Sequence, residues 1–245
     1  MKLLTVGNTK TLKGEAAGYK TFILHLAPAS LSGYNTCPAA SSGCMAACLN
    51  TAGRGRFTRT QEARIRRTKM FFEHRDAFMA TLVKDIADGI RMAKREGLIP
   101  VFRLNGTSDI RWETVPVFTS VTYKGVTTIY NAPNVMIAFP DIQFYDYTKL
   151  TNRRNIPANY HLTFSRSESN EDQIQLMALA GLLSMNVAVV FNVKPKDQLP
   201  KTYLSLPVVS GDNTDLRFLD PAGSVIGLTA KGLGKKDMSG FVVRV

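Results

Sequence analysis

The sequence has few residues of the types that most metal and nucleophile sites use. It contains 3 cysteines, 3 histidines and 1 tryptophan in 245 residues, and 19 acidic residues against 31 basic ones. An odd number of cysteines argues against a disulfide framework. No run approaches the 18 apolar residues of a membrane span, and no G-x-S-x-G or H-E-x-x-H motif occurs. We therefore expect no membrane partner and no serine hydrolase or zincin chemistry.

A secretion signal is also missing. The first residues, MKLLTVGNTKTLKG, carry one early lysine and a very short apolar run. We expect the protein to stay in the cytoplasm of the cell that makes it. The net charge of +12 favours polyanionic partners, nucleic acid first. The alternative is that the positive charge serves only to keep the protein soluble.

The order of apolar runs predicts one α/β domain over residues 1–245. Continuous apolar runs that read as strands lie at 20–28, 99–106, 141–149, 159–170, 187–193 and from 206, and 223–232 closes the pattern. Helical spacing is found at 59–96, at 171–186 and briefly at 133–140. The pattern predicts mostly parallel strands in a partial or irregular (β/α) barrel.

The long helical stretch carries its own end signals. Thr60 is a plausible N-cap and Gly97 a plausible C-terminal glycine. Because such a stretch is long for one helix, we expect a break near Glu73–Arg75.

All three cysteines lie in one loop after the first predicted strand, at residues 28–57, here called the cysteine loop. Cys37, Cys44 and Cys48 form the pattern C-x6-C-x3-C among glycines and alanines. Three thiolates fit a [4Fe-4S] cluster with one open iron, which becomes [3Fe-4S] if the labile iron is lost. A zinc site needs a fourth ligand, which only His25, His74 or His161 could add through the fold. Three buried structural cysteines are the remaining alternative.

Polar residues follow several predicted strands, where parallel sheets and barrels build their sites. We expect substrate-binding residues there, close to the cysteine loop. The candidates are Asn105, Ser108, Asp109, Asp146, Lys149, Ser165, Arg166, Glu168, Asp212, Asp215 and Arg217. Local roles compete with this interpretation: capped turns, helix caps and a buried salt bridge would explain many of them.

An arginine-rich segment follows the cysteines. Within RGRFTRTQEARIRRTKMFFEHR, Arg64 and Arg67 share a helical face, and only two glutamates offset the charge. We expect phosphate contacts from Arg54, Arg56, Arg59, Arg64 and Arg67. A solvated helix face is the plainer alternative.

The motifs together resemble an uncharacterised bacteriophage family called gene product eighty-eight. The resemblance rests on CPAASSGCMAAC, NTAGRGR, VFRLNGTSDI, QFYDYTK, YHLTFSRSESN, VAVVFN and VVSGDNTDLRFLDP, from about residue 20 to 232. It implies a phage origin rather than an activity.

A looser resemblance is to radical S-adenosylmethionine enzymes, which carry three cysteines after the first strand of a partial barrel. It implies that the open iron binds S-adenosylmethionine. The spacing differs from their C-x3-C-x2-C, and RLNGTSD stands where they have a glycine-glycine-glutamate motif. Two functions result: a [4Fe-4S] enzyme of this type acting on a small molecule, or a non-catalytic nucleic-acid-binding protein with a structural or sensing cluster.

Overall fold

The computed structural model describes residues 1–6, 9–179, 184–194 and 198–245. Its main feature is a nine-stranded sheet with the order β1-β2-β3-β6-β7-β8-β11-β10-β9. In that order the strands span Leu4–Thr5, Tyr19–Leu24, Ile99–Arg103, Gln143–Thr148, Tyr160–Ser165, Val187–Phe191, Val225–Thr229, Leu206–Ser210 and Thr202–Tyr203. The six longer strands predicted from the sequence are all present.

Seven adjacent strands run parallel, and only the short edge strands β1 and β9 are antiparallel to their neighbours. From β2 to β8 the strands lie side by side in chain order. The carboxyl ends of these strands therefore meet at one edge, which places their following loops together. The mixed α/β class and the parallel arrangement are confirmed. In the described residues the sheet is open between β1 and β9, so the barrel is not confirmed.

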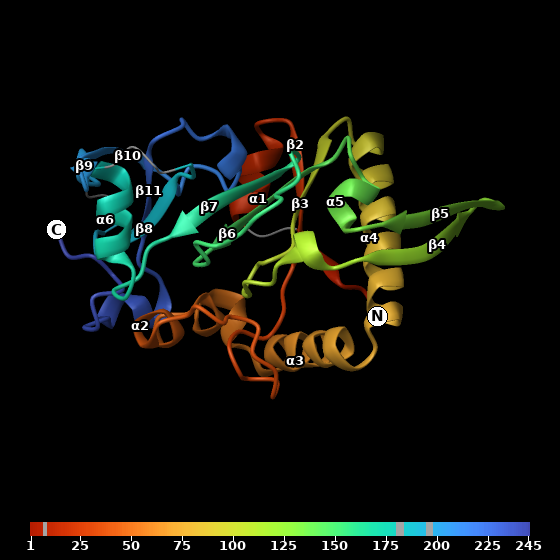
Figure 1. Ribbon diagram of the computed structural model, residues 1–245, viewed down its shortest axis with the longest axis horizontal. Helices are drawn as coiled ribbons and strands as arrows, with labels where there is room; N and C mark the ends of the chain where they lie inside the picture. The colour runs from red at the N-terminus through yellow and green to blue at the C-terminus, as the bar shows by residue number, and fades with distance from the viewer. Residues whose placement is uncertain (7–8, 180–183, 195–197) are drawn as a thin grey trace.

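The long helical stretch is two helices, α3 at Thr58–Glu73 and α4 at Arg75–Arg95 (Figure 1). His74 separates them with φ −137° and ψ 58°, which is not helical. The predicted break is confirmed. Gly97 has φ +70°, the left-handed conformation expected after a helix end. The predicted N-cap is wrong, because Phe57 holds that position without a side-chain hydrogen bond.

The remaining helices are short. They are α1 (Thr9–Glu15), α2 (Ser42–Ala46), α5 (Val135–Ala138), α6 (Glu171–Leu179) and the 3-10 turns η1 (Leu49–Thr51), η2 (Gly53–Arg56), η3 (Trp112–Thr114), η4 (Arg217–Leu219) and η5 (Gly232–Lys236). The helix predicted to end at residue 186 is described only to 179, and residues 184–186 are not helical. No helix in the described ranges is long and apolar enough to cross a membrane.

The two faces of the sheet have different character because side chains alternate along each strand. One face packs Phe22, Phe102 and Phe144 against α4, where Gly89 leaves room for the rings. The other face carries polar residues such as Arg103 and His161, and is partly covered by η4, whose Phe218 contacts Tyr145.

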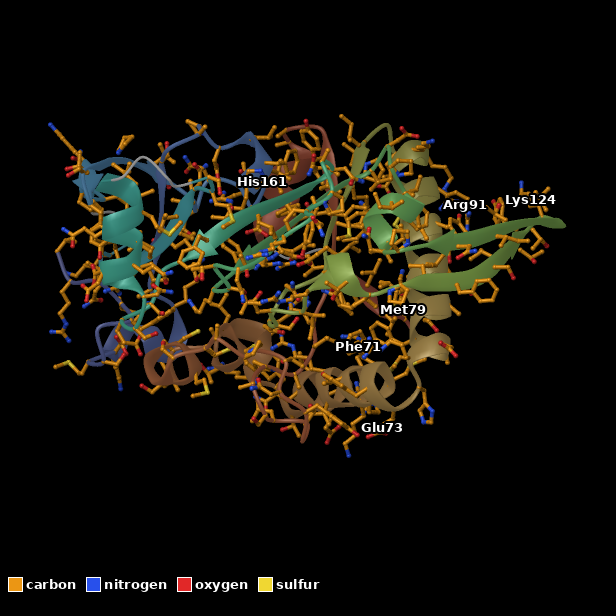
Figure 2. All side chains as sticks on the ribbon, viewed as in Figure 1. Phe71, Glu73, Met79, Arg91, Lys124 and His161 are labelled. Atoms are coloured by element: carbon orange, nitrogen blue, oxygen red, sulfur yellow. The ribbon has the colours of Figure 1, made fainter. Side chains whose placement is uncertain are left out.

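A hairpin of β4 (Val117–Tyr123) and β5 (Val126–Ala132) projects from the body, with Lys124 at its tip (Figures 1 and 2). The apolar runs of the sequence predict no strand here. One side of the hairpin joins the core through Val117 and Val121, whereas Phe118 and Ile129 are 78% and 73% exposed.

Candidate metal centre

The cysteine loop lies at the carboxyl edge of the parallel strands, between β2 and α3. Two cross-links join it to the loop after β3: Asp109 N donates to Thr36 O at 2.8 Å, and Thr107 Oγ1 donates to Leu26 O at 2.6 Å. Thr36 is fully buried, and its own hydroxyl donates to Ala27 O. These contacts fix Cys37 beside the end of β3.

Cys37 is half-buried in a turn. Its backbone N–H donates to Asn35 Oδ1 at 2.9 Å, and its Sγ lies 3.8 Å from Thr107 O. The side chain thus reaches from the first strand's loop to the second strand's loop, where the sequence predicted a shared site.

Cys44 and Cys48 are held by short helical turns. Ser41 caps α2, accepting from Cys44 N at 3.1 Å, and Cys48 Sγ accepts from Asn50 N at 3.5 Å. Asn50 in turn accepts a hydrogen bond from buried Arg64 of α3. An arginine therefore lies close to Cys48.

The three thiols form one electrostatic group. Burial raises the pKa of each thiol, and for Cys44 to about 11. The pKa of Cys44 is raised further by Cys48 and Cys37, and that of Cys48 by Cys37. Lys149 opposes the shift at Cys37 and Cys44, and Arg64 opposes it at Cys48. Each thiol therefore influences the pKa of another or is influenced by one, and Lys149 and Arg64 act on the same group of thiols.

The sulfurs do not close on a single ion. Among the residues described there is no group of three His, Cys, Asp or Glu side chains placed to hold one metal ion. Three sulfurs on one zinc lie about 4 Å apart, because each Zn–S bond is about 2.3 Å. A multi-iron cluster binds each sulfur through a different iron and suits wider spacing.

Lys149 projects from the end of β6 toward the cysteines. Its Nζ donates to Ser165 Oγ at 2.8 Å and lies 5.1 Å from the centre of the Phe241 ring. Burial lowers its pKa, whereas Cys44, Asp109 and Glu168 raise it. The structure thus brings Lys149 and Ser165 together beside Cys44.

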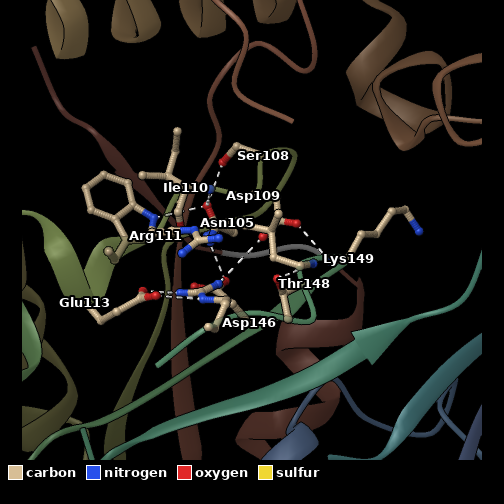
Figure 3. Close-up of polar contacts among 12 residues, drawn as sticks. Asn105, Ser108, Asp109, Ile110, Arg111, Glu113, Asp146, Thr148 and Lys149 are labelled. Atoms are coloured by element: carbon tan, nitrogen blue, oxygen red, sulfur yellow. Dashed lines mark hydrogen bonds and ion pairs between the residues drawn. The ribbon is translucent and has the colours of Figure 1, made fainter. Parts of the chain in front are cut away.

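The predicted residues after β3 mainly shape their own loop (Figure 3). Asn105 Oδ1 accepts from Ser108 Oγ, from Ile110 N and from the indole of Trp112 at 2.9 to 3.1 Å. These bonds commit Asn105 and Ser108 to local structure. Asp109 accepts from Lys149 N at 2.8 Å and ties this loop to the end of β6.

Asp146 does not face the cysteines, since it lies three residues before Lys149 and so on the opposite side of the strand. It is fully buried and accepts from Leu104 N, from Asn105 N and from the hydroxyl of Tyr160. Burial raises its pKa to about 7. We interpret it as a structural link among three strands.

Arg166 and Glu168 attach other segments to the end of β7. Arg166 donates to the carbonyls of Gly240 and Phe241 and pairs with Glu171. Glu168 accepts from Ser41 Oγ and from Gly43 N, each at 2.8 Å. They fasten residues 230–245, here called the C-terminal segment, and α2 to the sheet, as their neighbouring ribbons in Figure 1 illustrate.

The three predicted residues after β10 lie on the polar face of the sheet. Asp215 pairs with Arg103 of β3 at 2.9 Å, and Arg217 pairs with Asp220 at 3.2 Å. Asp212 accepts from Thr229 N and pairs with Lys231. These contacts agree with the alternative interpretation, in which salt bridges order this loop, rather than with substrate binding.

The arginine-rich segment divides into two parts. Arg54, Arg56 and Arg59 are exposed, together with Phe57, whose ring centre lies 5.8 Å from the Arg56 guanidinium carbon. Arg64 and Arg67 do share one face, but Arg64 is 7% exposed and Arg67 is half-buried, donating to Lys2 O. Arg64 therefore faces the centre of the molecule, where phosphate backbones do not reach.

Two residues near the cysteines have structural roles that the sequence did not predict. Gly43 is one, since an added Cβ would lie 2.7 Å from Glu168 Oε1 and 2.8 Å from Phe241 Cβ. Another is His25 at the end of β2, whose pKa burial and Arg64 lower to about 3. For Gly43, the position of a glycine between two cysteines was the available sequence signal. For His25, nothing in the sequence indicates that it lies near Arg64 of α3.

Comparison with known protein families matches residues 2–245 of the chain to the family gene product 88. The chain belongs to the gene product 88 family. The bacteriophage family expected from the motifs is thus confirmed. Among curated proteins and among solved structures, nothing matches the chain. Family membership leaves the chemistry of the centre to be argued from its residues.

Proposed function

We propose that the protein binds an iron–sulfur cluster through Cys37, Cys44 and Cys48, with one iron left open to a small molecule. The gathering of all three cysteines in one loop at the carboxyl edge of the sheet carries this proposal. Three protein thiolates leave one iron of a [4Fe-4S] cluster open, whereas a structural zinc site takes four protein ligands.

The surroundings suit an anionic cluster. Three bound thiolates add negative charge in a buried place, and Lys149 and Arg64 supply cations beside them. Ala47 and Phe241 form part of an apolar cluster that contacts Cys44 and limits access of water. Cluster binding must deprotonate thiols whose pKa is raised, so loading should be favoured by higher pH.

When bound, such a cluster supplies one-electron reduction and a Lewis-acidic iron that takes amino and carboxylate groups, as those of S-adenosylmethionine. Residues of the chain would position the small molecule bound at the open iron. Lys149 places a positive charge next to Cys44, and Asp109 fixes the backbone of Lys149. If the protein is an enzyme, we propose that it carries out radical chemistry with the bound S-adenosylmethionine.

Anaerobic reconstitution followed by iron, sulfide and visible absorption measurement tests the cluster. We expect about four irons and four sulfides per chain, or about three irons after loss of the open one. Each Cys→Ser variant should lose most of this iron. Met45→Ser is the matched control, because Met45 is a sulfur-bearing residue of the same helix but is 49% exposed.

One tightly bound zinc with no sulfide would exclude the cluster, as would full iron loading of the Cys→Ser variants. Electron paramagnetic resonance of the reduced protein then tests whether S-adenosylmethionine binds to the cluster. A signal that changes on adding S-adenosylmethionine supports the enzyme, whereas an unchanged signal removes that part and leaves the cluster.

A second candidate function is binding of single-stranded nucleic acid by the exposed segment at Gly53–Arg59. Exposed Phe57 between three exposed arginines combines a stacking ring with phosphate-binding charge. Affinity should fall with salt. Neutralising Arg54, Arg56 and Arg59 to glutamine should reduce the salt slope by about 2, at about 0.7 per phosphate contact.

Arg66→Gln is the control for that experiment, since Arg66 lies on α3 like Arg59, with a side chain 61% exposed. Binding that is indifferent to salt, or equal loss of affinity in the control, would reject this candidate.

A further inference from the structure

A pocket of about 270 Å³ lies beside the cysteine loop. It is formed where the start of the cysteine loop, the end of α3 and the segment after β3 meet. Its lining residues include Asn35 and Pro38 of the cysteine loop, Phe71 and Phe72 of α3, Arg75 of α4 and Arg111 after β3. Asn35 and Pro38 flank Cys37 in the chain, so the pocket adjoins one ligand of the proposed centre.

Two cations line this pocket. The Arg75 guanidinium carbon lies 3.6 Å from the centre of the Phe71 ring, and its Nε donates to Phe71 O at 2.6 Å. These contacts hold the guanidinium in place, and Figure 2 shows Phe71 on the side of α3 that faces the body of the molecule. Arg111 donates to the neutral side chain of Asn152. Neither Arg75 nor Arg111 takes part in an ion pair with a carboxylate in the described residues.

The one acidic residue of the pocket has its own partners. Asp109 lies 3.6 Å from Arg153 Nη1 and accepts from Lys149 N (Figure 3). Arg153 also pairs with Glu113, so it offsets the charge of Asp109 only in part. The lining still carries two arginines against one carboxylate and is positive as a whole.

Most of the remaining lining is apolar, with Asn35 and Thr114 as its other polar residues. The apolar side chains include Phe71, Phe72, Ile110, Val115 and Leu150. Small-molecule sites combine such apolar walls with a few fixed polar groups, and guanidinium pairs bind carboxylates and phosphates strongly.

We propose that this pocket binds a small organic anion, a carboxylate or a phosphate monoester on an apolar group. Its role as a substrate for the centre at Cys37 rests on the proposed function. The binding itself depends only on Arg75, Arg111 and the apolar wall.

Calorimetry with benzoate, phenyl phosphate and neutral benzamide tests the proposal, using both metal-free and reconstituted protein. All three probes share the ring, and benzamide lacks the charge. We expect at least one anion to bind ten-fold or more tightly than benzamide. The stronger anion tells whether the site prefers a carboxylate or a phosphate. Benzamide binding as tightly as both anions, or no anion binding at 10 mM, about the weakest affinity of interest, would overturn the proposal.

Arg75→Gln and Arg111→Gln should each weaken the better anion about ten-fold and leave benzamide unchanged. Arg66→Gln on the exposed side of α3 is the matched control. Because Arg75 also packs on Phe71, thermal unfolding checks its fold, and Arg111→Gln gives an independent measurement. Anion binding unaltered in both variants would refute the assignment. Since metal-free protein is tested too, failure here is separable from a failure to load iron.

Discussion

Gly43 offers the sharpest test of how the cysteine loop is held. It is buried between Cys37 and Cys44, and a Cβ on it would collide with Ser239 Oγ and would lie 2.8 Å from Phe241 Cβ. The Ser239 hydroxyl can rotate away, but the Phe241 Cβ belongs to the backbone frame of the C-terminal segment. Gly43→Ala must therefore strain this contact or push α2 away from Glu168.

Either response has a similar cost. Overpacking costs about 1–3 kcal/mol. Loss of a hydrogen bond to a charged group, here from Gly43 N to Glu168, costs about 1.5–3 kcal/mol. We expect Gly43→Ala to lower the free energy of unfolding by about 2–3 kcal/mol, which a domain with 5–15 kcal/mol survives. Urea denaturation should show a lower midpoint at an unchanged slope.

Gly234→Ala is the matched control. Gly234 lies in the C-terminal segment against the same loop, yet an added Cβ would meet Ala47 Cβ at an ordinary 3.5 Å. It should change the free energy of unfolding by less than about 0.5 kcal/mol. Adding Ser239→Ala to Gly43→Ala should restore part of the loss, because the contact with Phe241 remains. A Gly43→Ala protein as stable as the Gly234→Ala control would refute this account.

Three further changes test neighbouring features. Glu168→Gln should cost about 1–2 kcal/mol, and hydrogen exchange at Gly43 should quicken relative to wild type; unchanged exchange would contradict the anchoring role. In metal-free protein the raised pKa of Cys44 favours the folded state only while the thiol is protonated. The free energy of unfolding should therefore fall between pH 9 and 11, by at most about 3 kcal/mol relative to Cys44→Ala; equal pH profiles would show that the thiol is not buried as described. Asp146, with its pKa raised to about 7, should make wild type lose stability relative to Asp146→Asn as pH rises from about 4 to 7; the opposite slope would mean that its three hydrogen bonds outweigh burial.

Local patterns predicted much of the fold. The break at His74 followed from the length of an apolar repeat, and Gly97 marked a helix end. Continuous apolar strands implied parallel pairing. The hairpin at 117–132 was not predicted, since it has no continuous apolar run and only Val117 and Val121 of its two strands are buried.

The position of the cysteines in the fold could be predicted from the sequence, but most of the individual contacts around them could not. The rule that loops gather at the carboxyl edge put the cysteines beside Lys149 and Ser165. It could not assign Arg166 to the carbonyls of Gly240 and Phe241, because those partners lie more than 70 residues away in the chain. Nor could it show that Asn105 forms its hydrogen bonds within its own loop, because one of them is to Trp112, whose position is known only from the structure.

The packing of the C-terminal segment on the cysteine loop has a consequence during synthesis. Strands β2 to β8 can pair in the order in which they emerge, but the segment that covers Cys44 is made about 180 residues after the last cysteine. At 5–20 residues per second, the thiols stay uncovered for roughly 10 to 40 seconds. If the protein takes up iron as proposed, Cys44 is more accessible during this interval than in the finished molecule, where Phe241 and Val242 pack against it.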